Sequence, residues 1–112
     1  MEERNIIKWS EYSGYTEQTI PSGEIWMSES EMVDLFGVFI PKLRNAIKAL
    51  YKEELVKPSE AEKSIKKRDN FYVSVYNMEV VLLLAFRLNS YQARAVRREL
   101  MERSNTQRLS LL

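Results

Sequence analysis

Two short helix-forming segments joined by one glycine, between residues 28 and 50, constrain the fold of this chain more than any other feature. Ser28 and Glu31 have the spacing of a capping box, in which each side chain accepts a hydrogen bond from the backbone N–H of the other residue. An apolar stripe at helical spacing follows, formed by Met32, Leu35 and Phe36. Gly37 then supplies the left-handed backbone that ends many helices. We therefore predict a helix over about residues 29–36.

A second helix is predicted over about residues 41–50. Pro41 suits the first helical position, because its missing N–H has no hydrogen-bond partner there. The apolar residues that follow recur at the spacing of one buried face, namely Leu43, Ile47 and Leu50. Two amphipathic helices with a tight turn at residues 37–38 are typical of a helix-turn-helix, whose second helix lies in the major groove of DNA.

The outward face of the second helix carries side chains that suit contacts with DNA. They are Lys42, Arg44, Asn45 and Lys48. Arginine binds guanine and asparagine binds adenine through paired hydrogen bonds, whereas lysine binds phosphate or guanine. A charged face is also common on helices that only meet solvent, so both interpretations stay open. Phe39 and Ile40, at the helix entry, allow three interpretations: burial, contact with thymine methyl groups, or a protein-contact patch.

Strand-forming segments flank the two helices. Residues 6–9, 15–20 and 24–27 are short and rich in β-forming residues, and they predict a hairpin or a three-strand meander. Residues 71–76 form the strongest predicted strand, and residues 64–67 would oppose it in a second hairpin. The basic tip of this second hairpin would contact the DNA backbone as a wing and comprises Lys66, Lys67 and Arg68. We therefore predict an α+β fold, a winged-helix-like helix-turn-helix domain with small β-hairpins.

The C-terminal third predicts two further helices. Asn77 would cap a helix over residues 78–88, which is apolar nearly all round and is therefore predicted to be the buried central helix. A last helix would run from residue 91 to about residue 103. It carries four arginines, of which three suit contacts with phosphate or form a solvated face, namely Arg94, Arg97 and Arg98. We expect one domain over residues 1–103 and a tail over residues 104–112, either frayed or the start of a further segment.

Charge is unevenly distributed along the chain. The formal net charge is +1, but residues 1–39 hold two basic and eight acidic residues, a net charge of −6. Residues 40–112 hold 15 basic and eight acidic residues, a net charge of +7. Because the excess falls on the second helix, the hairpin tip and the last helix, it has the distribution expected of a nucleic-acid footprint.

Composition excludes several other classes of protein. The chain has no cysteine and no histidine, so disulfides, the usual zinc sites and Ser–His–Asp triads are excluded. We expect no enzymatic activity, no cofactor, no metal and no small-molecule ligand. The N-terminus lacks the apolar segment of a signal peptide, and the longest apolar run, Val80 to Phe86, is far short of the roughly 20 residues that span a bilayer. We expect a cytoplasmic protein without membrane partners.

The motif around the first helix resembles a known family. Residues 25–38 read Ile-Trp-Met-Ser-Glu-Ser-Glu-Met-Val-Asp-Leu-Phe-Gly-Val and are followed by Pro41, Leu43 and Ile47. This resembles the N-terminal region of the virulence RhuM family, in which a typical segment reads Ile/Val-Trp-Leu-Thr-Gln-x-Gln-hydrophobic-Ala-Glu-Leu-Phe-x-Val-Ser-x-Pro-Thr-Ile. The resemblance extends over about residues 5–101, through the Val-Tyr-Asn-Met-Glu and Phe-Arg-Leu-Asn-Ser segments to Arg97.

The resemblance implies a phage-type DNA-binding module, with DNA as partner, from a prokaryotic or phage-derived regulator of transcription. The resemblance implies no enzymatic activity. It also indicates Arg97 as a candidate for DNA contact, because Arg97 matches an arginine of the family. The chain departs from the family where Phe39 stands in place of a serine, Lys42 in place of a threonine and Ala46 in place of a histidine. The scaffold is therefore retained better than the contact surface.

A rival hypothesis is a protein-interaction or homodimerisation module on the same scaffold. Its contact surfaces would be Phe39 with Ile40, and the leucine-rich end of the chain, Leu109, Leu111 and Leu112.

Overall fold

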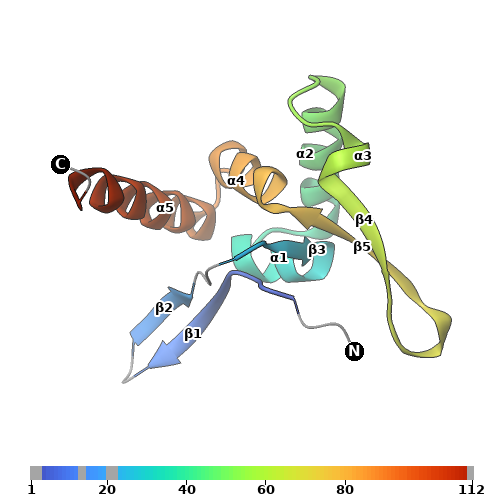
Figure 1. The fold of residues 1–112 in the computed structure, drawn as a ribbon, viewed down its shortest axis with the longest axis horizontal. Coiled ribbons are helices and arrows are strands. Elements are labelled where there is room, and N and C mark those ends of the chain that lie inside the picture. Colours follow the sequence, from blue (N-terminus) through green and yellow to red (C-terminus); the bar gives the residue numbers. More distant parts are fainter. Residues whose placement is uncertain (1–3, 13–14, 20–22, 111–112) are drawn as a thin grey trace.

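A computed structural model describes residues 4–12, 15–19 and 23–110, with side chains for residues 4–9 and 23–102 (Figure 1). Within this part of the chain the fold is α+β, as predicted. One antiparallel sheet has the strand order β3-β5-β4, formed by β3 (Trp26–Ser28), β5 (Tyr72–Asn77) and β4 (Glu62–Lys66). Met27 lies opposite Tyr76, and Ile65 lies opposite Val73.

A separate two-stranded hairpin precedes the sheet. It consists of β1 (Lys8–Tyr12) and β2 (Tyr15–Thr19). The predicted hairpin is confirmed, but the three-strand alternative is wrong, because β3 pairs with β5 and not with β2. The reason is burial: Met27 on β3 is fully buried, and β5 supplies the buried partners Val75 and Tyr76.

The two predicted helices are present with their predicted signals. They are α1 (Glu29–Phe36) and α2 (Ile40–Lys52). Ser28 Oγ accepts a hydrogen bond from the Glu31 N–H at 3.3 Å, and Glu31 Oε1 accepts one from the Ser28 N–H at 2.8 Å, which confirms the capping box. Gly37 adopts the left-handed conformation, with φ 61° and ψ 43°.

The remaining helices are α3 (Pro58–Ala61), a single turn η1 (Arg68–Asn70), α4 (Met78–Arg87) and α5 (Tyr91–Ser110). Asn77 caps α4 as predicted, because its Oδ1 accepts a hydrogen bond from the Val80 N–H at 3.2 Å. Helix α4 is predicted to be the buried central helix, and its core face is buried, but Leu82 and Phe86 lie at the surface. Helix α5 extends beyond the expected end near residue 103, because residues 104–110 contain no glycine or proline to stop it.

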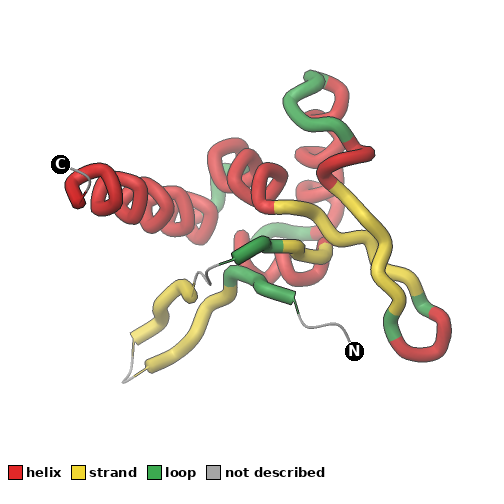
Figure 2. The backbone as a smooth tube through the Cα atoms, in the orientation of Figure 1, coloured by secondary structure: helices red, strands yellow, loops and turns green. Residues whose placement is uncertain are grey.

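Helices α1, α2, α4 and α5 enclose the core, to which α1 contributes Met32, Leu35 and Phe36 and α2 contributes Leu43, Ile47 and Leu50. The β4–β5 hairpin extends away from this core as a twisted ribbon (Figure 2). Helix α5 lies at the opposite end of the molecule from the tip of that hairpin (Figure 1). None of the helices described is long and apolar enough to cross a membrane.

Candidate nucleic-acid interface

Helix α2 presents a polar outward face because its apolar residues pack into the core. Leu43 and Ile47 are buried beneath the helix, and this orientation leaves Lys42, Asn45 and Lys48 exposed. Three of the four side chains predicted on the outward face of α2 are therefore brought together on one accessible surface.

Arg44 differs from these three residues because it is bound to α1. Its Nε donates to Glu29 Oε2 at 3.0 Å, and its Nη2 donates to Glu29 Oε1 at 3.2 Å. The hydrogen bonds and the charge of Glu29 raise the pKa of Arg44 above its ordinary value. A planar guanidinium held by both carboxylate oxygens has its donors directed at α1 rather than outward. The predicted base-contacting arginine is therefore occupied by a partner 15 residues earlier in the chain.

A tyrosine cluster, formed by Tyr51, Tyr76 and Glu62, joins this side of α2 to the sheet. Burial and the nearby carboxylates of Glu62 and Glu29 raise the pKa of Tyr76 to about 12. Burial, followed by Glu62, also raises the pKa of Tyr51, whose buried hydroxyl lacks a hydrogen bond of normal geometry to any described residue. Sequence reasoning missed this cluster, which places Tyr51 of α2 near Glu62 at the start of β4.

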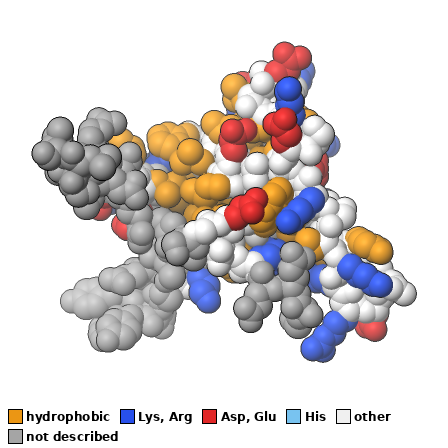
Figure 3. All heavy atoms as spheres, in the orientation of Figure 1, with side chains coloured by type: hydrophobic (Ala, Val, Ile, Leu, Met, Phe, Trp, Pro, Cys, Tyr) orange, Lys and Arg blue, Asp and Glu red, His pale blue; other side chains and the backbone are white. Residues whose placement is uncertain are grey.

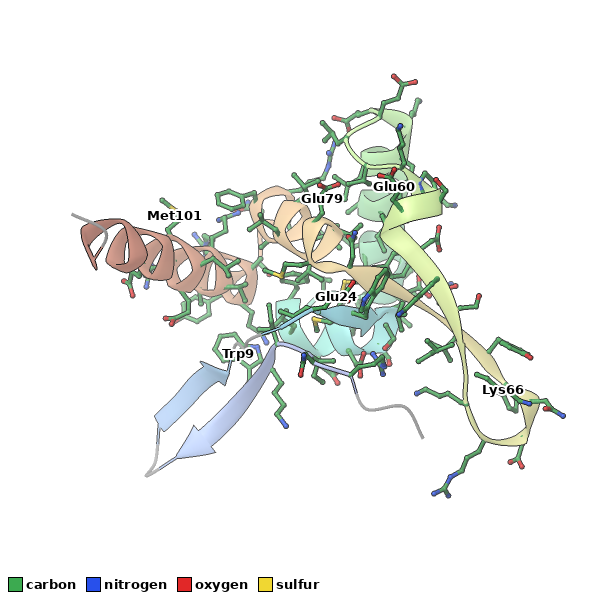
Figure 4. All side chains as sticks on the ribbon, viewed as in Figure 1. Trp9, Glu24, Glu60, Lys66, Glu79 and Met101 are labelled. Atoms are coloured by element: carbon green, nitrogen blue, oxygen red, sulfur yellow. The ribbon has the colours of Figure 1, made fainter. Side chains whose placement is uncertain are left out.

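The tip of the β4–β5 hairpin carries the predicted basic residues and two aromatic residues that were not singled out. Lys66, Lys67 and Arg68 are exposed, and Lys66 extends from the hairpin near its tip (Figure 4). Asp69 and Asn70 make the turn with φ values of 61° and 63°, a backbone that these two residue types tolerate. Phe71 and Tyr72 are 70% and 65% exposed. Lysine and arginine side chains project from the far end of the hairpin beside a hydrophobic side chain (Figure 3).

Arg97 has a structural role in α5. Its Nη1 donates to three backbone oxygens at the end of α4, those of Ala85 at 2.9 Å, Phe86 at 3.3 Å and Leu88 at 3.1 Å. These carbonyls are among those that a helix C-terminus leaves without partners. Arg97 therefore caps α4, and it is not brought together with the residues of α2 and the hairpin tip.

Side chains distant in sequence hold the C-terminal end of α1. Trp9 Nε1 donates to the Leu35 oxygen at 2.8 Å, and Ser90 Oγ donates to the Phe36 oxygen at 2.5 Å. Trp9 belongs to β1 and extends toward the helices (Figure 4). Trp26 is likewise engaged, since Lys63 Nζ lies 4.3 Å from the centre of its ring. The first two contacts tie the C-terminal end of α1 to β1 and to the turn that precedes α5.

The positive half of the sequence is thus split in space. The described basic residues of α5 lie at the other end of the molecule from the hairpin tip (Figure 1), whereas α2 is followed in the chain by α3 and then by the hairpin. Among the described residues, no group of three or more Asp, Glu, His or Cys side chains is arranged to hold a metal ion.

Comparison with known proteins gives no relative for this chain: no family model matches it, and no curated protein or solved structure is significantly similar. The functional argument therefore rests on the geometry described above.

Proposed function

We propose that this protein binds double-stranded DNA, with α2 in the major groove and the β4–β5 hairpin as a wing. The observation that carries the proposal is the chain order β3–α1–α2–β4–β5 combined with the sheet order β3-β5-β4. The hairpin returns to the strand that precedes the helix pair, so α2 and the wing are parts of one connected unit. This order supports the proposal of a winged helix-turn-helix.

The surface chemistry supports the same proposal. Lys42, Asn45 and Lys48 are exposed on one side of α2, and lysine and asparagine side chains are suited to phosphates and base edges. Binding would be driven mainly by neutralisation of phosphates, so affinity is expected to fall steeply as salt is raised. A cytoplasmic regulator of transcription is the role that fits such a module best.

The test is a fluorescence-anisotropy titration of a mixed-sequence DNA duplex at several salt concentrations. Lys42→Ala/Lys48→Ala is expected to reduce the slope of log affinity against log salt by about two. The matched control is Lys8→Ala/Arg94→Ala, which removes the same charge from β1 and α5. Equal slopes for the two double variants, or no binding by the wild type, would contradict the proposal.

Membership of the virulence RhuM family is part of the same proposal. Several residues that carry the resemblance have scaffold roles here: Ser28 and Asn77 cap helices, and Gly37 ends one. Because such positions determine the backbone, the resemblance supports a shared scaffold more strongly than shared DNA contacts.

A second candidate function rests on Phe39, which is 85% exposed at the N-cap of α2. An aromatic side chain this exposed favours a protein contact, including a homodimer. Size-exclusion chromatography with light scattering tests it. A dimer that dissociates in Phe39→Ser, together with absence of DNA binding by the wild type, would favour this function over DNA binding.

A further inference from the structure

The tip of the β4–β5 hairpin combines exposed aromatic rings with lysines in a specific register. Lys66 lies directly opposite Tyr72 in the ladder. One residue nearer the tip, the Lys67 N–H donates to the Phe71 oxygen at 2.6 Å, which continues the pairing. Since side chains of successive residues alternate between the faces of a strand, each face of the hairpin ends in one lysine opposite one aromatic ring.

The side chains of the hairpin are buried near the core but exposed at the tip. On the face of Phe71, Ile65 is 7% exposed and Val75 is fully buried, whereas Phe71 itself is 70% exposed. An exposed phenylalanine at the end of a hairpin, beside three cationic residues and one acidic residue, contributes nothing to the core. Its surroundings suit a ligand that offers both an apolar slot and negative charge.

The length of the hairpin points to where that slot lies. The Glu62–Tyr76 pair is set beside α2, and Phe71, which immediately precedes β5, is five residues from Tyr76 toward the tip of the hairpin. At about 3.3 Å per residue this gives a reach of about 17 Å. Half a helical turn of B-form DNA, the distance from a major groove to the next minor groove, is also about 17 Å.

We propose that the hairpin tip enters the minor groove beside the major groove occupied by α2, where Phe71 wedges against a base step. Lys66, Lys67 and Arg68 would bind the phosphates on both sides of that groove. Apolar wedges of this kind partly unstack a base step and bend the duplex toward the major groove. This inference rests on the proposed function and adds to it a distortion of the DNA.

The two kinds of contact have different salt dependence, which makes them separable. Loss of a wedge removes an uncharged contact, so Phe71→Ala is expected to lower affinity by about ten- to a hundredfold at every salt concentration, with an unchanged slope. Lys66→Ala/Lys67→Ala is expected to reduce the slope by about two. Tyr91→Ala is the matched control, because it removes a 79% exposed ring from α5.

The bend is measured with a mixed-sequence duplex of about 30 base pairs, roughly three helical turns, carrying a donor and an acceptor fluorophore at its ends. Wild type and Tyr91→Ala are expected to shorten the end-to-end distance equally, and Phe71→Ala to leave the duplex straight. Because Phe71 is exposed, all variants are expected to share the wild-type thermal unfolding curve.

Three results would overturn the inference. If Phe71→Ala bends and binds DNA like the wild type while Lys42→Ala/Lys48→Ala binds weakly, the wedge is wrong and the proposed function stands. If the wild type binds no DNA, both fail. If Phe71→Ala loses binding to phosphatidylserine vesicles that the wild type binds, and its DNA affinity is unchanged, the tip is a membrane contact instead.

Discussion

Arg44 on α2 and Glu29 at the first residue of α1 form a two-point ion pair, with N–O distances of 3.0 and 3.2 Å. The pair crosses between the two helices that the proposed function assigns to DNA binding. Glu29 is the more buried partner, with 28% of its side chain exposed against 58% for Arg44. A phosphate or a guanine would therefore have to compete with a carboxylate that is already held in position.

We predict that Glu29→Gln strengthens DNA binding by about two- to fivefold, the range expected when a surface ion pair is released. In the proposed complex the substitution would remove a negative charge beside the DNA, and it leaves Arg44 free to bind. Asp34→Asn removes the same charge from an exposed position on α1 and is the control. Anisotropy titration measures both variants, and an affinity for Glu29→Gln equal to that of Asp34→Asn would argue that Arg44 is not at the interface.

Glu31 predicts how stability depends on pH. Burial alone would raise the pKa of Glu31, but hydrogen bonds from Arg4 and from the Ser28 backbone, with the charge of Arg4, outweigh burial and hold the pKa below its ordinary value. The folded state therefore binds this proton less readily than the unfolded state. Stability from Glu31 is present above the ordinary carboxyl pKa and is lost as the pH falls through the lower, folded value.

Urea unfolding at pH 7 and at successively lower pH below the ordinary carboxyl pKa of 4.5 tests this directly. Glu31→Gln is expected to cost about 1–3 kcal/mol at pH 7, because glutamine can still accept from the Ser28 N–H but leaves Arg4 without its charged partner. It is also expected to flatten the acid branch of the stability curve. An unchanged loss of stability in acid for Glu31→Gln would show that other carboxylates dominate it.

Local signals in the sequence predicted much of the scaffold. The capping box and the Asn77 cap depend on residues only three positions apart, and Gly37 depends on its own backbone preference. These features can be predicted because the interacting residues are only a few positions apart, so their spacing in the sequence identifies the interaction. The α+β class, the β4–β5 hairpin and the outward face of α2 follow from such short-range patterns.

Long-range relationships could not be obtained in this way. Phe71 has the alternation of an inward-facing strand residue, but it is exposed because the hairpin extends past the core. The pairing of Arg44 with Glu29 and the capping by Arg97 depend on how helices pack. The uneven charge along the sequence predicted one basic footprint that includes the last helix. That footprint is smaller than predicted, because α5 lies away from the hairpin tip (Figure 1).

Arg97 is predicted to contribute to stability and not to DNA binding. Arg97→Ala leaves carbonyls at the end of α4 without a donor, and loss of a charged hydrogen bond of this kind costs about 1–3 kcal/mol. Arg94→Ala removes the same charge from an exposed position on α5 and is expected to unfold like the wild type. Thermal unfolding compares the two, and a salt slope for DNA binding that fell only in Arg97→Ala would contradict the structural role.

Gly37 combines a backbone requirement with a close contact, and the two can be separated. Its φ of +61° is a conformation that other residues adopt at a cost of about 1–2 kcal/mol. A Cβ at this position would also lie 1.7 Å from Gln92 Oε1, at the end of a side chain that donates to the Asp34 oxygen. Gly37→Ala is therefore expected to destabilise the protein by about 2–3 kcal/mol, as the backbone cost and one lost hydrogen bond add.

Gln92→Ala removes the obstructing side chain and provides the second arm of a double-mutant cycle. We expect Gln92→Ala alone to cost about 1 kcal/mol through its lost hydrogen bond, and the double variant to cost less than the sum of the single variants, because the clash is relieved once. Denaturant unfolding of the four proteins measures the coupling. Strict additivity would show that the Gln92 side chain moves aside freely, so that the left-handed backbone alone accounts for the requirement for glycine.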